Sequence, residues 1–253
     1  MIPLHGIPEL EEGDDLGALL AEAATRAGGL EPDDVVVVAQ KVVSKVEGRI
    51  VQLEGVEASE RALELAGDGD ARRTEMILRE AREIVRARAP LVIAETRHGF
   101  VCASAGVDAS NAKGPDTLVL LPLDPDGSAA SLRERLHELT GAEVGVVVSD
   151  SFGRAWRLGT TDVALGVAGI TAVLDLDGLH DSAGYQLHAT QIAVADEIAG
   201  ADVGHISPVH VVAVELDGVP ADRDATEVVQ QPHGGAHRSR RVHRVGDQVA
   251  DAQ

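Results

Sequence analysis

Two short segments of the chain consist almost entirely of apolar residues. Residues 35–39 read VVVVA and residues 144–148 read VGVVV. Uninterrupted apolar runs of this length are typical of strands whose two faces are both covered by other elements, as in a parallel sheet between helices. We therefore expect both segments to be buried strands, and each of them runs directly into polar residues.

Other segments carry their apolar residues at the spacing of a helix or in short runs. Helical periodicity predicts helices over residues 15–26, 74–88, 131–139 and 190–199. Short apolar runs predict strands over 91–94, 100–103, 118–121 and 208–214, of which the first two are expected to pair. No internal repeat is visible. The mixture of strands and helices indicates a mixed α/β fold.

Composition and charge narrow the classes of partner. The 253 residues, of which 44% are hydrophobic, suffice for one large domain or two small ones. Acidic residues number 42 against 22 basic ones, giving a net charge of −20. A field of this sign repels phosphodiester backbones, so we expect no nucleic-acid partner.

The chain also lacks the signals of membrane insertion and secretion. It has no apolar run of transmembrane length, and its N-terminus has neither a basic flank nor an apolar signal core. Cys102 is the single cysteine, which excludes an internal disulfide framework. We expect a cytoplasmic protein with no membrane partner, built as one domain over residues 1–232 and a flexible, arginine-rich tail over 233–253.

Carboxylates that could carry chemistry lie beside the apolar runs. Asp150 and Ser151 follow the second run at what we expect to be a strand tip, and Asp108 and Asn111 share the loop AGVDASN. Carboxylates with neighbouring hydroxyl or amide oxygens suit Mg²⁺ or Mn²⁺. Turns and helix caps would explain the same residues without any ligand, so both interpretations stay open at this point.

Positive charge is also placed unevenly. Only three lysines occur in the chain, and two of them, Lys41 and Lys45, lie in a polar turn expected after the first apolar run. A lysine there suits a phosphate group, although a solvated surface pair is the alternative. Arg154 and Arg157 follow Asp150 and offer planar forks for phosphate or carboxylate, while Trp156 could stack on a ring or fill the core. These residues indicate metal-assisted phosphoryl chemistry on a nucleotide or another phosphate substrate. The sequence shows no Walker motif, protein-kinase signature or G-x-G-x-x-G fingerprint.

The same segments resemble the CofE-type γ-glutamyl ligases of coenzyme F420 biosynthesis, including the N-terminal ligase domain of bacterial FbiB proteins. The matching segments run in order from residue 6 to about residue 202. They are GIPEL with GDDL, VVVVAQKVVSKVEGR, AGVDASN, LLPLDPD, VSDSFGRAWRLGTTDVALGVAG and GYQLHATQIAVADEIAGA.

This resemblance implies a reaction and a fold. The reaction adds L-glutamate through γ-linkages to the deazaflavin phospholactate precursor F420-0, hydrolyses GTP to GDP and phosphate, and passes through an acyl phosphate. Mg²⁺ or Mn²⁺ is implied, and a monovalent cation such as K⁺ is compatible with it. The implied fold is mixed α/β (α+β), neither Rossmann nor P-loop, and forms an intertwined homodimer.

The resemblance also implies roles for individual residues. Nucleotide contacts fall on Ile7, Pro8, Glu9, Leu10, Gln40, Lys45 and Asn111. The first metal falls on Asp108 and Asp150, and a second metal on Ser151. The catalytic set is Asp108 and Asp150 together with Arg154 and Arg157, the two arginines being physical candidates for substrate phosphate or carboxylate.

The sequence departs from the family pattern after Asp202. Val203-Gly204-His205 stands where the family usually has a Met-Gly-Lys-like turn, and the strand expected over 208–214 does not end in Arg-Gly. The ligase hypothesis therefore has two alternatives. One is a GTP- and metal-binding homologue with lost or altered catalysis, and the other is a ligase with a changed acceptor or amino acid.

Overall fold

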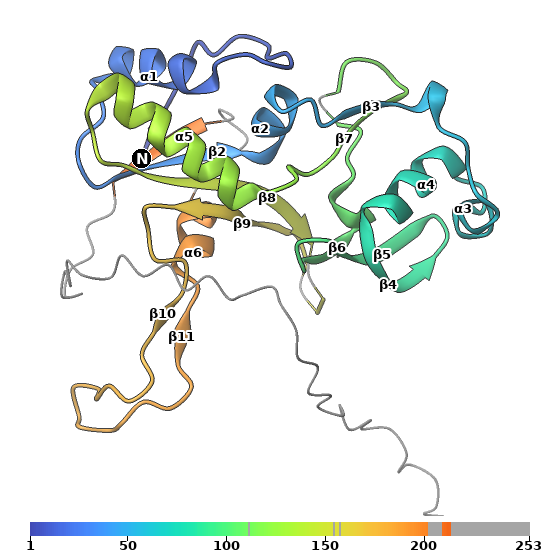
Figure 1. The fold of residues 1–253 in the computed structure, drawn as a ribbon. Coiled ribbons are helices and arrows are strands. Elements are labelled where there is room, and N and C mark those ends of the chain that lie inside the picture. The colour runs from blue at the N-terminus through green and yellow to red at the C-terminus, as the bar shows by residue number, and fades with distance from the viewer. Residues whose placement is uncertain (111, 154, 157, 202–208, 214–253) are drawn as a thin grey trace, which may run out of the picture. The chain divides into compact units, whose positions relative to one another are not determined.

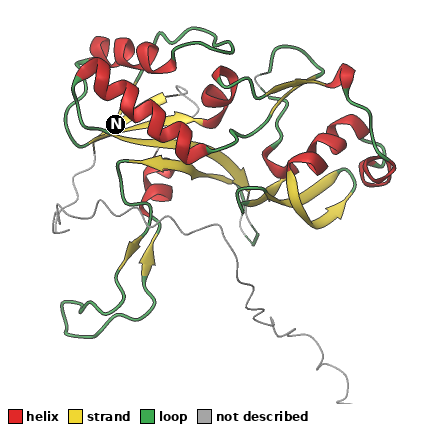
Figure 2. Cartoon of the chain, in the orientation of Figure 1, coloured by secondary structure: helices red, strands yellow, loops and turns green. Residues whose placement is uncertain are grey.

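The computed structural model describes residues 1–110, 112–153, 155–156, 158–201 and 209–213 (Figures 1 and 2). All of them belong to one compact unit, Met1–Glu215. The expected domain boundary after residue 232 and the tail over 233–253 lie outside the described residues, so both stay predictions. No described helix is long and apolar enough to cross a membrane.

The described elements mix strands and helices along the chain, as expected for a mixed α/β fold. The helices are α1 (Leu16–Ala27), α2 (Gln40–Val46), α3 (Glu60–Ala66), α4 (Ala71–Glu80), α5 (Pro125–Thr140) and α6 (Val194–Ala201). The strands are β1 (Ile2–Pro3), β2 (Asp34–Ala39), β3 (Ile50–Gln52), β4 (Ala81–Arg88), β5 (Leu91–Thr96), β6 (Val101–Ala103), β7 (Thr117–Val119), β8 (Gly145–Gly153), β9 (Thr160–Ala168), β10 (Leu174–Asp175), β11 (Gln191–Ile192) and β12 (Val209–Ala213).

The largest sheet has five strands in the order β1-β12-β2-β8-β9. Its two central strands, β2 and β8, are the two apolar runs, and they pair in parallel with Val36 opposite Val146. The other neighbours in this sheet are antiparallel. The expected buried strands are therefore confirmed, and β2 continues directly into α2 at the edge where the candidate site residues begin.

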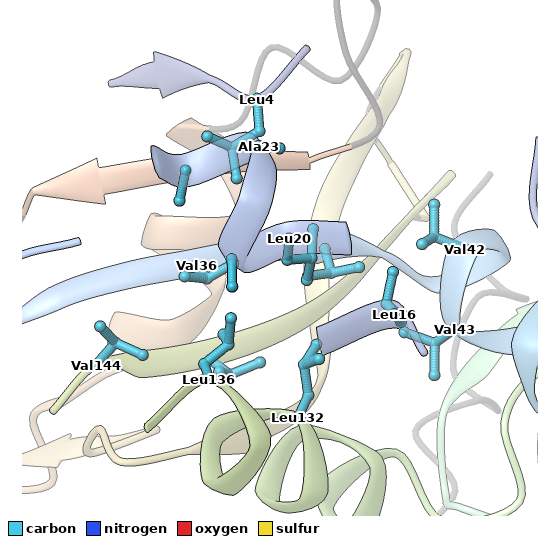
Figure 3. Close-up of a cluster of buried hydrophobic side chains, with 14 of the residues drawn as sticks. Leu4, Leu16, Leu20, Ala23, Val36, Val42, Val43, Leu132, Leu136 and Val144 are labelled. Carbon is cyan, nitrogen blue, oxygen red and sulfur yellow. The ribbon is translucent and has the colours of Figure 1, made fainter. Parts of the chain in front are cut away.

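Both faces of these central strands are covered by helices. Val36 and Val38 pack with Leu20 and Leu136 of α1 and α5 on one face (Figure 3). The alternate residues of the same strand face the other way and pack against α6, in a cluster that includes Ile198. Successive side chains of a strand point to opposite faces, and both faces are covered here. Every position of the run is therefore apolar.

Helix α1 begins and ends as its sequence predicts. The Asp15 side chain accepts a hydrogen bond from the backbone N–H of Ala18 at 3.0 Å, which caps the helix, and Gly28 with a φ of 122° ends it. Helix α5 is longer than the predicted 131–139, because it begins at Pro125, where the Asp124 side chain caps it.

A second core lies under the three-stranded antiparallel sheet β4-β5-β6 and the ribbon β3-β7. It contains Met76 and Ile77 of α4 together with Val92, Leu118 and Leu120. The predicted pairing of the segments 91–94 and 100–103 is confirmed as β5 with β6.

Two helix predictions were wrong in part. The segment 74–88 is a helix only to Glu80, after which β4 pairs with β5 from Ala81 to Arg88. Charged residues at seven of the fifteen positions left the local pattern ambiguous, so the pairing with β5 decides the outcome. The segment 190–199 likewise begins with strand β11, and α6 starts only at Val194.

Candidate functional site

Residues 40–46 form a helix, which corrects the expectation of a polar turn after β2. Helix α2 buries Val42 and Val43 in the core, and Val46, one turn after Val42, packs against the same cluster. Gln40, a predicted nucleotide contact, is buried. Its Nε2 donates to Ser44 Oγ at 2.7 Å and to the carbonyl oxygen of Leu120 at 3.0 Å. In this arrangement Gln40 fixes α2 against the segment that follows β7.

The predicted nucleotide-contacting turn, residues 7–10, reaches the other end of α2. Leu10 is buried in the main core, while Pro8 and Glu9 are exposed. Lys45 Nζ lies 2.6 Å from Glu9 Oε1, and this hydrogen bond lowers the pKa of the Glu9 carboxyl. The structure therefore brings Glu9 and Lys45 together as an ion pair, and their assignment to the nucleotide stays a prediction.

Asp108 lies at the end of a tightly wound loop. Ser104, Ala105 and Gly106 all have positive φ values, of 56°, 51° and 73°. Such conformations are costly for residues other than glycine and concentrate at functional sites. The backbone of Asp108 is then fixed by two hydrogen bonds to Val119, at 3.0 and 2.8 Å. The loop thus holds the Asp108 carboxylate in a defined place.

The side chain of Asp108 makes the local turn expected for its type. Its Oδ1 accepts from the backbone N–H of Ser110 at 2.8 Å, and its Oδ2 accepts from Ser110 Oγ at 2.9 Å. Its Oδ2 also lies 2.6 Å from Lys41 Nζ. Burial raises the pKa of this carboxyl, but the hydrogen bonds from Lys41 and Ser110 outweigh burial and leave the pKa lowered.

Lys41 is a site residue that sequence reasoning did not assign. Its ammonium contacts both Asp108 Oδ2 and Ser110 Oγ, each at 2.6 Å. Two signals could have found it: the rarity of lysine in this chain, and the four-residue spacing to Lys45, which places both side chains on one side of a helix.

Asp150 lies within a strand and not at a strand tip, which corrects a second expectation. Strand β8 continues to Gly153 because it pairs with β9 as far as Thr160. Burial raises the pKa of Asp150 to about 6. A hydrogen bond from the Ser151 backbone and the charge of Lys41 act against this rise, and the charges of Asp108 and Asp162 add to it. The carboxyl of Asp150 is therefore close enough to Lys41 and Asp108 for their charges to act on its pKa.

Ser151 lies opposite Asp162 in the register of β8 and β9. Because successive side chains of a strand point to opposite faces, Ser151 and Asp150 face opposite sides of the sheet. Ser151 is exposed. Its assignment to a second metal stays a prediction.

Cys102 is buried close to Asp150. Burial, together with the charge of Asp150, raises the pKa of the Cys102 thiol to about 11. A thiol of that pKa is protonated at neutral pH, and the thiolate is the nucleophilic form. Cys102 is therefore a buried packing residue near Asp150 and does not act as a nucleophile.

The two carboxylates suit one kind of cation better than others. Among the described residues, no three His, Cys, Asp or Glu side chains converge as a complete ligand set. Mg²⁺ is commonly held by one or two carboxylates, with the remaining positions filled by water and substrate phosphates. Asp108 and Asp150 fit that pattern, and the ammonium of Lys41 shows that the region accepts a cation.

Three predicted residues, Asn111, Arg154 and Arg157, lie outside the described residues. Trp156 is described and is fully exposed, so the interpretation that it fills the core is wrong. The neighbouring Leu158 is also fully exposed. The β8–β9 connection thus presents two large apolar side chains to the surroundings of this chain.

A shallow depression of about 500 Å³ lies elsewhere, between β9, β11 and α6. Its lining includes Asp162, Asp196 and Glu197. Asp196 accepts a hydrogen bond from the backbone N–H of Ala164 at 2.9 Å, which ties α6 to β9. None of the predicted site residues lines this depression.

Comparison with known proteins gives a consistent result. Residues 6–203 match the profile of the family F420-0:Gamma-glutamyl ligase. A coenzyme F420:L-glutamate ligase of Methanothermobacter thermautotrophicus is 43% identical over 205 residues, covering 79% of this chain and 81% of that protein. Proteins of the same description are 45% identical in Methanopyrus kandleri, over 76% of this chain and 75% of that protein, and 42% identical in Archaeoglobus fulgidus, over 79% and 78%.

Proposed function

The chain belongs to the F420-0:gamma-glutamyl ligase family, and we propose that it joins L-glutamate to coenzyme F420-0 at a site built around Asp108 and Asp150. The ligase activity follows from this membership. The placement of the site rests on the ion pair between Asp108 of the 104–110 loop and Lys41, and on Asp150 of β8, whose carboxyl feels the charges of both Lys41 and Asp108.

The proposed reaction needs GTP and a divalent metal. The carboxylate of F420-0 attacks the γ-phosphorus of GTP, forming an acyl phosphate and releasing GDP. The amine of L-glutamate then attacks the acyl carbon, and phosphate leaves as the amide forms. Mg²⁺ or Mn²⁺, held by Asp108 and Asp150, would neutralise charge that develops on the transferred phosphoryl group. Ser151 is assigned to a second metal on the family resemblance alone.

The residues of this chain have separate tasks in that scheme. Lys45 and the turn 7–10 bind the nucleotide, because Lys45 is a compact positive charge held at the turn by Glu9. Gln40 keeps α2, and so both of its lysines, in register with the Leu120 segment. Asn111 is assigned to the nucleotide, and Arg154 and Arg157 to substrate phosphate or carboxylate, on the family resemblance and on their chemistry.

We also propose a homodimer. Large apolar side chains are exposed on the hairpin that carries β10 and β11 and on the β8–β9 connection, among them Leu179, Tyr185 and Trp156. Exposed apolar groups of this size are characteristic of protein interfaces. Light scattering of the purified chain should give twice the monomer mass, and a monomer at micromolar concentration would reject this part of the proposal.

The test of the function is the mass of the product. The purified protein is incubated with F420-0, L-glutamate, GTP and Mn²⁺, and we expect the precursor to gain one or more glutamyl residues only when GTP is present. Asp150→Asn is the matched variant and should form product about 10³-fold more slowly. GTP and Mn²⁺ binding without any gain in mass would contradict the ligase proposal and favour a homologue that binds without turnover.

A further inference from the structure

The ammonium group of Lys41 is held by a loop far from it in sequence. Its two acceptors are Asp108 Oδ2 and Ser110 Oγ, each 2.6 Å away. The side chains of Lys41 and Asp108 are only 23% and 42% exposed. This pair is thus more enclosed than the fully solvated ion pairs that contribute little to stability.

Each lysine of the chain is paired with a carboxylate in the same part of the fold. Lys45 lies 2.6 Å from Glu9, and Lys113 lies 2.8 Å from Glu11. Of the three, only Lys41 contacts a carboxylate that the proposed function gives to the metal. The other two lysines pair with carboxylates that are not assigned to the metal. Lys113, whose side chain is 62% exposed, therefore serves as the control.

We propose that Lys41 is the internal counter-ion of the metal site, and that its ammonium and the divalent cation compete for Asp108 Oδ2. This inference rests on the proposed function, because that function assigns Asp108 to the metal. Lys41 is accordingly a positioning residue. It keeps Asp108 neutralised and the 104–110 loop attached to α2 until a cation replaces it.

The competition follows from the number of partners at one oxygen. Asp108 Oδ2 already accepts from Ser110 Oγ at 2.9 Å and from Lys41 at 2.6 Å, so a cation that binds this oxygen takes the place of one of them. Lys41 is the one to leave, because two positive charges within a few ångströms repel each other while a hydroxyl does not.

The helix under Lys41 does not need to move for this exchange. Gln40 and the buried Val42 and Val43 anchor α2 to the core, whereas the lysine side chain is a flexible four-carbon stem. Once released, the ammonium stays one helical turn from Lys45 on the same side of α2. It then adds a second positive charge beside the residue assigned to the nucleotide phosphates.

The test is the affinity of the metal itself, measured on the full chain without nucleotide. Mn²⁺ is titrated and free Mn²⁺ is followed by electron paramagnetic resonance. Lys41→Met should bind Mn²⁺ about three- to tenfold more tightly than the wild type, because the pair removed is stronger than an exposed one and weaker than a buried one. Lys113→Met removes the same charge from a neighbouring pair and should bind as the wild type does.

A second variant and a second readout separate competition from simple support of the fold. Lys41→Arg keeps the positive charge and should not bind Mn²⁺ more tightly than the wild type. Without metal, Lys41→Met should unfold at a lower temperature than the wild type, yet gain more from added Mn²⁺. A residue that merely supports the loop would show weaker Mn²⁺ binding on removal.

Unchanged or weakened Mn²⁺ binding in Lys41→Met overturns the inference, and so does tightening of equal size in Lys113→Met. The failure of the proposed function has a different signature. In that case Mn²⁺ binds wild type and Asp108→Asn equally, or binds neither, whatever residue stands at position 41.

Discussion

Asp108 and Asp150 are the same chemical group in two environments, and their carboxyls respond in opposite directions. Asp108 lies on a strained loop, where Lys41 and Ser110 hold its pKa below the ordinary value. Asp150 lies within a sheet strand, where burial raises its pKa to about 6. Proximity to Lys41 alone does not decide the charge of a carboxyl. Direct hydrogen bonds to the ionised form lower its pKa, and burial without enough of them raises it.

This difference suggests that the carboxyls of Asp108 and Asp150 have different roles in metal binding. Asp108 is ionised over the whole physiological range and already holds a cation. Asp150 is poised to ionise near neutral pH and is stabilised in its charged form when a metal arrives. The predictions below test each half of this comparison.

Asp150→Asn should have the largest effect. We expect turnover to fall by about 10³-fold, since one of two metal carboxylates is lost from a reaction that depends on charge neutralisation. Steady-state rates measure it, with circular dichroism to check the fold. Asp162→Asn is the matched control on the neighbouring strand and should lose far less. Equal losses in the two variants would refute a special role for Asp150.

Acid should weaken metal binding through Asp150 and not through Asp108. Because the pKa of Asp150 is about 6, Mn²⁺ affinity should fall by about tenfold for each pH unit below 6, as one proton competes with the metal. Affinity that stays constant from pH 7 to pH 5 would show that Asp150 is not a ligand.

The same shift predicts an opposite trend in the stability of the metal-free protein. A carboxyl with a raised pKa stabilises the fold while protonated, and this contribution is lost as the pH rises through about 6. Wild type should therefore lose stability relative to Asp150→Asn between about pH 4 and about pH 7. Urea unfolding at several pH values measures this trend, and the reverse trend would contradict it.

Lys45→Ala should weaken GTP binding by about tenfold and leave binding of F420-0 nearly unchanged, because one phosphate-directed charge is removed. Calorimetry with each ligand separates the two effects. Lys113→Ala removes a lysine from a more exposed ion pair and serves as the reference. An equal loss for both ligands would count against a phosphate role for Lys45.

Gly106→Ala tests the strain of the Asp108 loop, with a smaller effect. Gly106 has a φ of 73°, and a Cβ there would lie 2.6 Å from Leu121 Cγ. We expect the free energy of unfolding to fall by about 1–3 kcal/mol. Gly99→Ala is the matched control, since Gly99 also has a positive φ but its Cβ would contact nothing within 4 Å. A cost no larger than that of Gly99→Ala would show that Leu121 does not restrict the loop.

The sequence predicted the elements whose local pattern agrees with their tertiary environment. The apolar runs of β2 and β8 could be recognised because a strand buried on both faces has no polar position to confuse with a helix. The segment 74–88 could not be divided correctly, because its change from α4 to β4 depends on pairing with β5. Helix α2 was not predicted because its polar residues, among them Gln40, Lys41 and Lys45, made the segment resemble a polar turn.

The sequence supplied candidate site residues one by one but not their arrangement. Asp108 and Asp150 were identified by type and by resemblance, and the structure brings their carboxyls toward one region. The contact of Lys41 with Ser110 spans 69 positions in the sequence, and no local pattern encodes a contact of that range. The raised pKa of Asp150 was equally inaccessible, because burial is a property of the folded chain.

A double-mutant cycle on Mn²⁺ binding tests the central claim that Asp108 and Asp150 hold one cation together. Wild type, Asp108→Asn, Asp150→Asn and the double variant are titrated with Mn²⁺ at pH 7.5. If both carboxylates bind the same ion, each single variant should lose most of the affinity, and the double variant should lose much less than the sum of the two losses. Losses that add fully, or single variants that bind Mn²⁺ as the wild type does, would contradict a shared site.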